Sequence, residues 1–291
     1  MDLSLLVQLL VGGLVLGMIY ALVAMGLSLI FGVLEIVNFA HGEFYMLGAV
    51  AAFFLSNGSA FSYWPTVVIV AAIAVAIGYV FYEALLASLQ GAGFERSILL
   101  TLGLSMILQN GMVYLLTANP RMVSNALTYQ SLAVGELRMP LVRLYALGAG
   151  AIAFIVLYLI LYRTRLGRAM RGVAQNRQAA LMVGIDARAV SRLAVAIGIG
   201  LSGLAGAALA PVYAVHPVMG SAFVFKAFAI IIIGGLGNVG GAAVAALALG
   251  MIEGVAAGFL PLVIVDALAF VSMIAILLFK PMGLFGRGVR V

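Results

Sequence analysis

Eight long apolar stretches follow one another along the chain, and charged residues, prolines or glycines separate them. They do not alternate apolar with polar positions as transmembrane β-strands do, and a helix that crosses a bilayer needs about 20 apolar residues. The pattern therefore predicts an all-α, polytopic transmembrane bundle of about eight helices. The stretches cover residues 3–31, 44–56, 64–87, 97–117, 141–162, 193–215, 223–258 and 262–279.

The seventh stretch is too long for one crossing. Residues 223–258 would form a helix about 54 Å long, although the hydrocarbon core measures about 30 Å. Five glycines lie among the eight residues 234–241, where helix propensity is low. A second glycine-containing break covers residues 32–42. We expect broken or re-entrant segments at both places, with the seventh stretch crossing the membrane twice.

The two breaks have similar surroundings. Residues 30–50 and 230–250 each read as an apolar run, a break with an asparagine, and a helix rich in alanine and glycine. Both copies would cross in the same direction, which is typical of a parallel internal repeat. Chance similarity between two small-residue helices is the alternative interpretation.

Composition points the same way. Apolar residues make up 66% of the chain and charged residues 8%, with a mean hydropathy of +1.26, whereas ordinary globular domains are about a quarter charged. There is no cysteine, which excludes disulfides and thiolate metal sites, and two histidines cannot form a His-rich metal site. The start of the chain lacks the basic region of a secretory signal, so we expect the first helix to be retained.

Charge predicts the orientation in the membrane. Residues 163–192 hold seven arginines and one acid, which places this segment in the cytoplasm by the positive-inside rule. Counting crossings from there puts the N-terminus outside and the C-terminal tail, with Lys280, Arg287 and Arg290, inside. The net charge of +6 therefore reflects membrane orientation, and no nucleic-acid partner is expected.

Three segments resemble one known family. Residues 26–48 are similar to the N-terminal segment of LivH-type permeases, residues 168–186 resemble the cytoplasmic loop of that family, and residues 234–238 extend the resemblance. These permeases are membrane subunits of ATP-binding-cassette importers for branched-chain and other hydrophobic amino acids. The resemblance covers about residues 5–285. It implies a single transmembrane permease domain, 1–291, in a bacterial inner membrane, with a coupling loop at 163–192.

The cytoplasmic loop contains a short predicted helix. Residues 174–183 are rich in helix formers, and Gly184 is a typical helix stop. The resemblance implies that this is the coupling helix, which contacts the ATPase subunit, although a glutamine stands where an acid is common. A basic loop that only fixes orientation is the alternative. The residues assigned to coupling are Arg168, Arg171, Ala174, Gln175, Asn176, Gln178 and Gly184.

Polar residues at membrane depth are candidates for a translocation path, because irregular backbone there lies beside protein or water. The residues assigned to the path are Asn38, His41, Gly234, Gly235 and Asn238. Glu43 and Glu253 are interpreted as structural: Glu43 in the first turn of a helix that Asn38 or the Gly42 backbone caps, and Glu253 paired with Lys226 or a backbone group. Glu83 and Asp266 are expected to be solvated and receive no role.

The outer loop at 118–140 has two interpretations. It carries Arg121, Glu136 and Arg138, with Arg143 just beyond, and these charges either dock a periplasmic binding protein or are simply solvated.

The resemblance also implies the partners. It predicts a second, LivM-type permease subunit, two ATP-binding subunits and a periplasmic substrate-binding protein, besides membrane lipid. The chain has no phosphate-binding loop before either lysine, so ATP and Mg²⁺ are expected on the partners and no cofactor, metal or catalytic site in this chain.

Four other functions fit the sequence less well. A urea or short-amide importer is the near alternative, and chain length favours amino acids. A proton-coupled carrier would use Glu35, Glu43 or Glu253 as relays but leaves the arginine-rich loop unexplained. A passive channel and a membrane-embedded enzyme lack their characteristic motifs.

Overall fold

The computed structural model describes residues 3–286, except residues 59–60, 92, 124–126 and 135–136. Glu136, Arg287 and Arg290 lie outside the described residues. The long helices are α1 (Leu3–Leu34), α2 (His41–Gly58), α3 (Tyr63–Phe81), α5 (Phe94–Leu116), α6 (Leu141–Arg163), α9 (Ala187–Leu209), α10 (Met219–Gly234), α11 (Val239–Ala256) and α12 (Leu262–Phe279).

Shorter elements complete the chain. A one-turn π-helix, η1 (Tyr82–Leu86), and α4 (Ala87–Leu89) extend α3, while α7 (Arg165–Gln175) and α8 (Arg177–Met182) follow α6. The strands β1 (Ser131–Val134) and β2 (Leu137–Pro140) form an antiparallel hairpin in which Ser131 is opposite Pro140.

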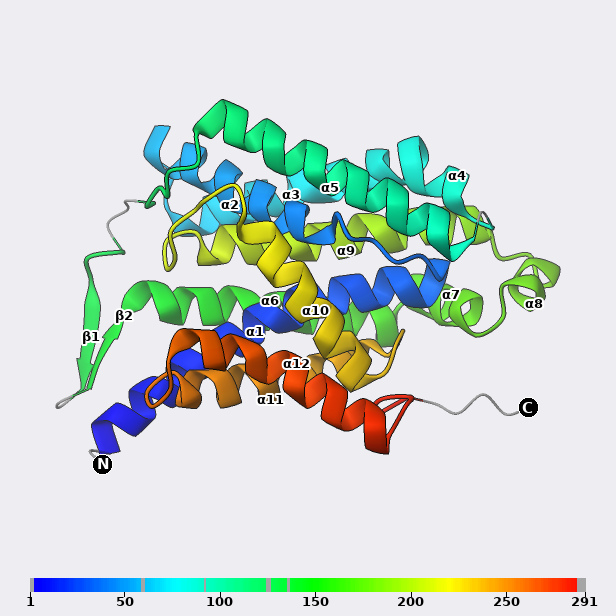
Figure 1. Cartoon of the computed structure of the whole chain (residues 1–291). Helices are drawn as coiled ribbons and strands as arrows, with labels where there is room; N and C mark the ends of the chain where they lie inside the picture. The colour runs from blue at the N-terminus through cyan, green and yellow to red at the C-terminus, as the bar shows by residue number, and fades with distance from the viewer. Residues whose placement is uncertain (1–2, 59–60, 92, 124–126, 135–136, 287–291) are drawn as a thin grey trace.

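The predicted all-α membrane bundle is confirmed. Within the described residues, seven helices are long and apolar enough to cross a membrane, and α10 is a shorter apolar helix. The seventh apolar stretch breaks into α10 and α11, as its length and glycines predicted, and it reverses direction between them (Figure 1).

Two helices form the centre of the bundle. Most residues of α1 and α9 are buried, and the backbones of these two helices cross where Gly26 meets Gly198. α11 packs on α1 at Gly13, and α3 packs on α9 at Gly78, again through backbone contacts. These small residues allow close helix approach, which is how helices associate in lipid. Few residues of α5 and α12 are buried, so these helices lie at the periphery.

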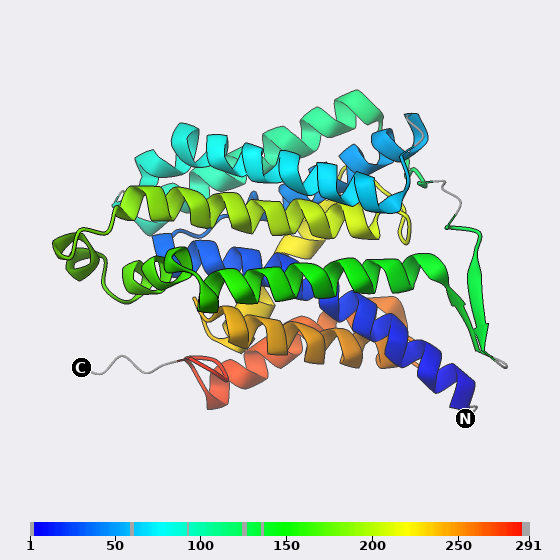
Figure 2. The same ribbon diagram turned by 180° about the vertical axis from the view of Figure 1, so that it is seen from behind.

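Two helices begin inside the bundle instead of at its ends. After α1, an irregular segment at 35–40 leads to α2, and after α9 a turn-rich loop leads to α10. The starts of α2 and α10 meet at Gly42 and Gly220, whose backbones are in close contact. The unit of α1 and α2 therefore faces the unit of α9 and α10. The two units are antiparallel, because α1 and α9 run in opposite directions (Figures 1 and 2). This arrangement differs from the parallel repeat based on Asn38 and Asn238, which stays a prediction.

The two ends of the bundle differ in character. α7, α8 and the last turn of α12 lie at one end of the bundle, whereas the start of α1 and the β1–β2 hairpin lie at the opposite end (Figures 1 and 2). All seven arginines of residues 163–192 therefore belong to one end of the molecule.

Candidate functional site

The basic segment folds as two helices instead of one. The predicted helix over 174–183 is wrong at its start, because α7 runs to Gln175 and α8 begins at Arg177. Asn176 lies between them in an extended conformation, and its Oδ1 accepts a hydrogen bond of 2.9 Å from the backbone N–H of Ala179. Asn176 therefore ends α7 and caps α8. Gly184, at a φ of +81°, ends the turn after α8 as predicted.

Ion pairs fasten this segment to the end of α3. Glu83 in η1 accepts from Arg188 at 2.6 Å and from Arg192 at 3.0 Å, and Arg177 donates to the Gln90 side chain at 2.8 Å. The expectation that Glu83 is only solvated is therefore wrong. Its partners lie more than a hundred residues away, so no local pattern could have indicated them.

The tip of the segment exposes apolar side chains. Leu181, Met182 and Val183 are 55%, 88% and 76% exposed at the end of α8, beyond the bundle. The predicted coupling residues Arg168 and Gln178 are exposed as well. Contiguous apolar side chains at an exposed tip are typical of a protein contact. The sequence contained this signal in three adjacent apolar residues before Gly184.

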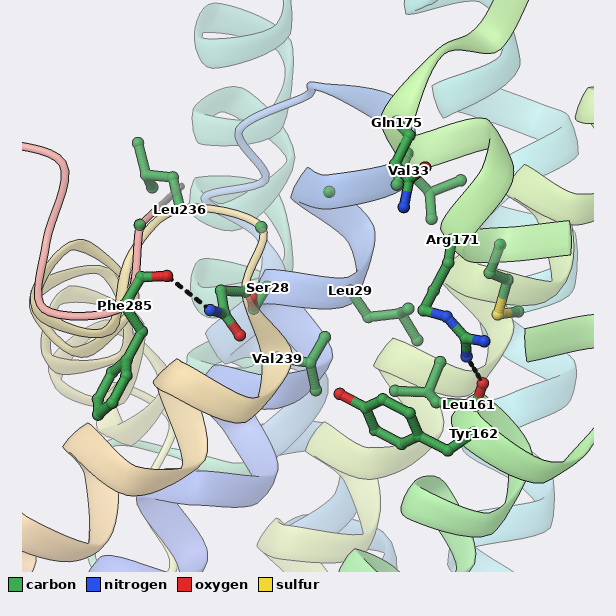
Figure 3. Close-up of a pocket in the computed structure, with 16 residues that line it drawn as sticks. Ser28, Leu29, Val33, Leu161, Tyr162, Arg171, Gln175, Leu236, Val239 and Phe285 are labelled. Carbon is green, nitrogen blue, oxygen red and sulfur yellow. Dashed lines mark hydrogen bonds between the residues drawn. The ribbon is translucent and has the colours of Figure 1, made fainter. Parts of the chain in front are cut away.

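A cleft of about 500 Å³ is lined in part by α7, the helix that precedes α8 (Figure 3). Its walls come from the end of α1, the end of α6, α7, the turn between α10 and α11, and residues 285–286. Ala174 and Gln175 line it from α7. Arg171 donates to the carbonyl of Leu161, and its guanidinium carbon lies 5.2 Å from the ring centroid of Tyr162.

Asn238 lines the same cleft from the opposite side. Its Oδ1 accepts from the backbone N–H of Gly241 at 2.9 Å, which caps α11, and its Nδ2 donates to the carbonyl of Phe285 at 2.8 Å (Figure 3). The structure thus brings Asn238 together with Arg171 and Gln175. The cleft is where the basic segment meets the broken seventh stretch.

The other predicted path residues lie elsewhere. His41 is fully buried, with Nε2 3.1 Å from the carbonyl of Val23, and its own carbonyl accepts from Ser202. Asn38 is also fully buried, and its Oδ1 accepts from the N–H of Ala40 at 3.1 Å. Neither residue lines the cleft.

The two path glycines pack against backbone. Gly234 touches Gly241, and Gly235, at a φ of +100°, packs against residue 286. Both positions lack room for a side chain, so their contribution in this structure is to close the turn between α10 and α11.

Glu43 lies in the first turn of α2, as predicted. Its contact with α5 was not predicted: Oε1 accepts from the hydroxyl of Ser105 at 2.9 Å. Glu43 has no exposed surface, and Oε2 has no hydrogen-bond partner among the described residues.

A second polar cluster joins four helices. Glu253 on α11 accepts from Lys226 of α10 at 2.9 Å and from Tyr20 of α1 at 2.8 Å. The predicted pairing of Glu253 with Lys226 is confirmed. Lys226 also forms an ion pair with Asp266 of α12 at 2.9 Å, which was not predicted, and the Asp266 side chain is 68% exposed, in agreement with the expectation that it is solvated.

Of the outer-loop arginines, Arg121 is held in place by hydrogen bonds. It donates to the carbonyl of Leu116 at 2.9 Å, and its backbone pairs with Val215 in an antiparallel bridge. Docking of a binding protein at this loop stays a prediction.

Comparisons with known proteins agree on one family. A family model described as branched-chain amino acid transport system, permease component, matches residues 9–277. The permease protein BraD of a high-affinity branched-chain amino acid transport system in Pseudomonas aeruginosa is 30% identical, over 96% of this chain and 95% of that protein.

Two further relatives bear related names. LivH of Salmonella typhimurium is 29% identical, covering 94% of each chain, and a probable LivH of Methanocaldococcus jannaschii is 25% identical, over 94% of this chain and 91% of its own. No solved structure matches the chain significantly. The resemblance to LivH-type permeases is thereby confirmed, and the chain belongs to the family of permease components of branched-chain amino acid transport systems.

Proposed function

We propose that this chain is the permease subunit that moves branched-chain amino acids into the cytoplasm in an ATP-binding-cassette importer. The names of the relatives BraD and LivH support this substrate class. In this proposal residues 1–291 form one non-catalytic permease domain. ATP and Mg²⁺ bind to two separate ATPase subunits, and a periplasmic binding protein delivers the amino acid.

The observation that carries the proposal is the exposed tip of α8. Leu181, Met182 and Val183 project at the arginine-rich end, where the positive-inside rule favours the cytoplasm. We assign this tip to a cleft of the ATPase subunit, with Arg168, Asn176, Gln178 and Gly184 in the surrounding coupling segment. The N-terminus then lies outside a bacterial inner membrane and the C-terminus inside.

The cleft beside α7 supports a route by which the ATPase subunit could act on the membrane helices. Arg171, Ala174 and Gln175 face Asn238 across it, so a push on α7 would reach the turn between α10 and α11. In the proposal Asn38, His41, Gly234, Gly235 and Asn238 belong to the translocation path or its immediate support. The path lies against a second, LivM-type permease, on the side of the sparsely buried α5.

Co-purification tests the proposal. The full-length chain is solubilised from its native membrane, its partners are identified by mass spectrometry, and ATP hydrolysis is measured with and without a leucine-loaded binding protein. We expect two ATPase subunits, a second permease and hydrolysis stimulated by the loaded protein. Recovery of the chain without an ATPase, together with leucine uptake driven by a proton gradient, would contradict it.

A further inference from the structure

Glu43 differs from the other sequestered glutamates in having no cationic partner. Among the described residues, Glu43, Glu83 and Glu253 are buried or half-buried. Glu83 pairs with two arginines, and Glu253 pairs with Lys226. Glu43 is fully buried, and from the part of the chain that the structure describes it accepts one hydrogen bond, from the neutral hydroxyl of Ser105, which leaves Oε2 without a partner there. An intramembrane carboxylate of this kind normally marks a functional site.

The position of Glu43 connects it to a movable element. It lies where α2 begins inside the bundle, beside Gly220 at the start of α10. α5 closes this place from outside: Ser105 donates to Glu43, and the hydroxyl of Thr101 accepts from the N–H of Phe39 at 3.2 Å. Of the seven spans, α5 packs least against the other helices, so it is the span that separates from the bundle with the smallest loss of packing (Figure 1).

The residues next to Glu43 add a hydrogen-bond donor and aromatic rings. Asn38, five residues before Glu43, is fully buried, and its Nδ2 has no hydrogen-bond partner among the described residues. Between them in the sequence, the ring of Phe39 lies 4.8 Å from that of Phe228 and 6.4 Å from that of Phe225, which is partly exposed. The segment therefore offers a carboxyl oxygen without a partner, an unused donor and an aromatic surface.

These groups complement an apolar amino acid in its zwitterionic form. We propose that Glu43 is the transient partner of the substrate's α-ammonium group, and that withdrawal of Ser105 with α5 uncovers the carboxylate for it. The passing ammonium then supplies the cation that Glu43 lacks in the closed structure. Asn38 meets the carboxylate of the substrate, and the phenylalanines contact its side chain. The inference rests on the proposed import of amino acids and names the group that guides the substrate.

The test compares Glu43→Gln with Ser105→Ala in the complete importer, with both permeases, the ATPases and the binding protein, in proteoliposomes. The quantity measured is leucine imported per ATP hydrolysed. Glu43→Gln keeps the shape and removes the charge, so we expect this ratio to fall about tenfold or more while stimulation of hydrolysis stays within about twofold. Ser105→Ala removes the same hydrogen bond but keeps the carboxylate, and we expect a ratio close to that of the wild type.

Three outcomes would overturn the inference. One is a Glu43→Gln importer with the wild-type ratio. Another is an equal loss in both variants, which would make the hydrogen bond to α5 the important feature. The third is a lower melting temperature for Glu43→Gln with a proportional loss of hydrolysis and uptake, as a purely structural cap would give. A wild-type complex that imports no amino acid would contradict the proposed function itself, and that control is read first.

Discussion

At the scale of single residues, glycines determine how closely the central helices pack. A β-carbon on Gly26 would lie 2.5 Å from the carbonyl oxygen of Gly198, and one on Gly198 would lie 2.7 Å from that of Gly26. Both neighbours are backbone atoms of buried helices, so neither can move aside cheaply. The crossing of α1 and α9 therefore requires glycine at both positions.

A side chain at this crossing should destabilise the protein. We expect Gly26→Val to lower the free energy of unfolding by about 1–3 kcal/mol or more, as overpacking of a filled core does. The melting temperature of the purified chain in detergent, followed by circular dichroism, measures the effect. Gly103→Val on α5 is the matched control, because nothing lies within 4 Å of a β-carbon there. Equal melting temperatures for the two variants would contradict the packing argument.

The cluster around Lys226 makes a second prediction at this scale. Lys226→Met leaves Glu253, which is 1% exposed, without its cation. Breaking a buried ion pair by removing one partner costs about 3–5 kcal/mol. We expect a large fall in melting temperature, and a partial recovery when Glu253→Gln is added to Lys226→Met. A double variant that is less stable than the single one would show that the charge of Glu253 is not the cause.

At the scale of elements, α8 is a short helix whose boundaries come from its caps. Asn176 begins it and Gly184 ends the turn behind it, so the apolar tip is held in one orientation. Glu83 and Arg192 hold the following helix, α9, against the end of α3. The tip therefore lies next to a helix that ion pairs fix in place, as we expect for a helix that is moved by another subunit.

The tip itself can be tested by charge. Met182→Asp puts a carboxylate into the proposed apolar contact, and we expect recovery of the ATPase subunits with the purified chain to fall about tenfold. Met122→Asp is the control, since Met122 is also an exposed methionine, at 67%, but lies in the loop between α5 and β1. Equal recovery of the ATPase with both variants would remove α8 from the interface.

At the scale of the whole molecule, the two ends of the bundle are assigned to opposite sides of the membrane. As a permease component, the chain is a multi-pass membrane protein that works with ATPase and substrate-binding components. Its arginine-rich end, with α7 and α8, and its hairpin end, with β1 and β2, lie far apart along the bundle axis (Figure 1).

The absence of cysteine from the sequence makes this orientation simple to test. An introduced cysteine is the only thiol, so a membrane-impermeant maleimide reports its side directly. We expect Ser131→Cys to react in intact spheroplasts and Gln178→Cys to react only after the membrane is opened. The reverse pattern would invert the proposed topology.

Much of the architecture could be predicted from the sequence, because hydrophobic runs and glycine clusters act locally. The division of residues 223–258 into two helices followed from their length and from the glycines at 234–241. The break at Asn176 was missed because alanine and glutamine around it favour helix on both sides, although asparagine is a common helix cap. The ion pairs of Glu83 with Arg188 and Arg192, and the hydrogen bond between Glu43 and Ser105, depend on packing between distant segments. No periodicity in the sequence encodes such contacts.

The glycine crossing of α1 and α9 also limits the mechanics of transport. Two backbones in direct contact leave no side-chain layer in which one helix could roll or slide against the other. We therefore expect α1, α3, α9 and α11 to move as one rigid body. The opening and closing of the transporter is then carried by the helices packed around these four. We expect a displacement at the basic end to move these four helices together.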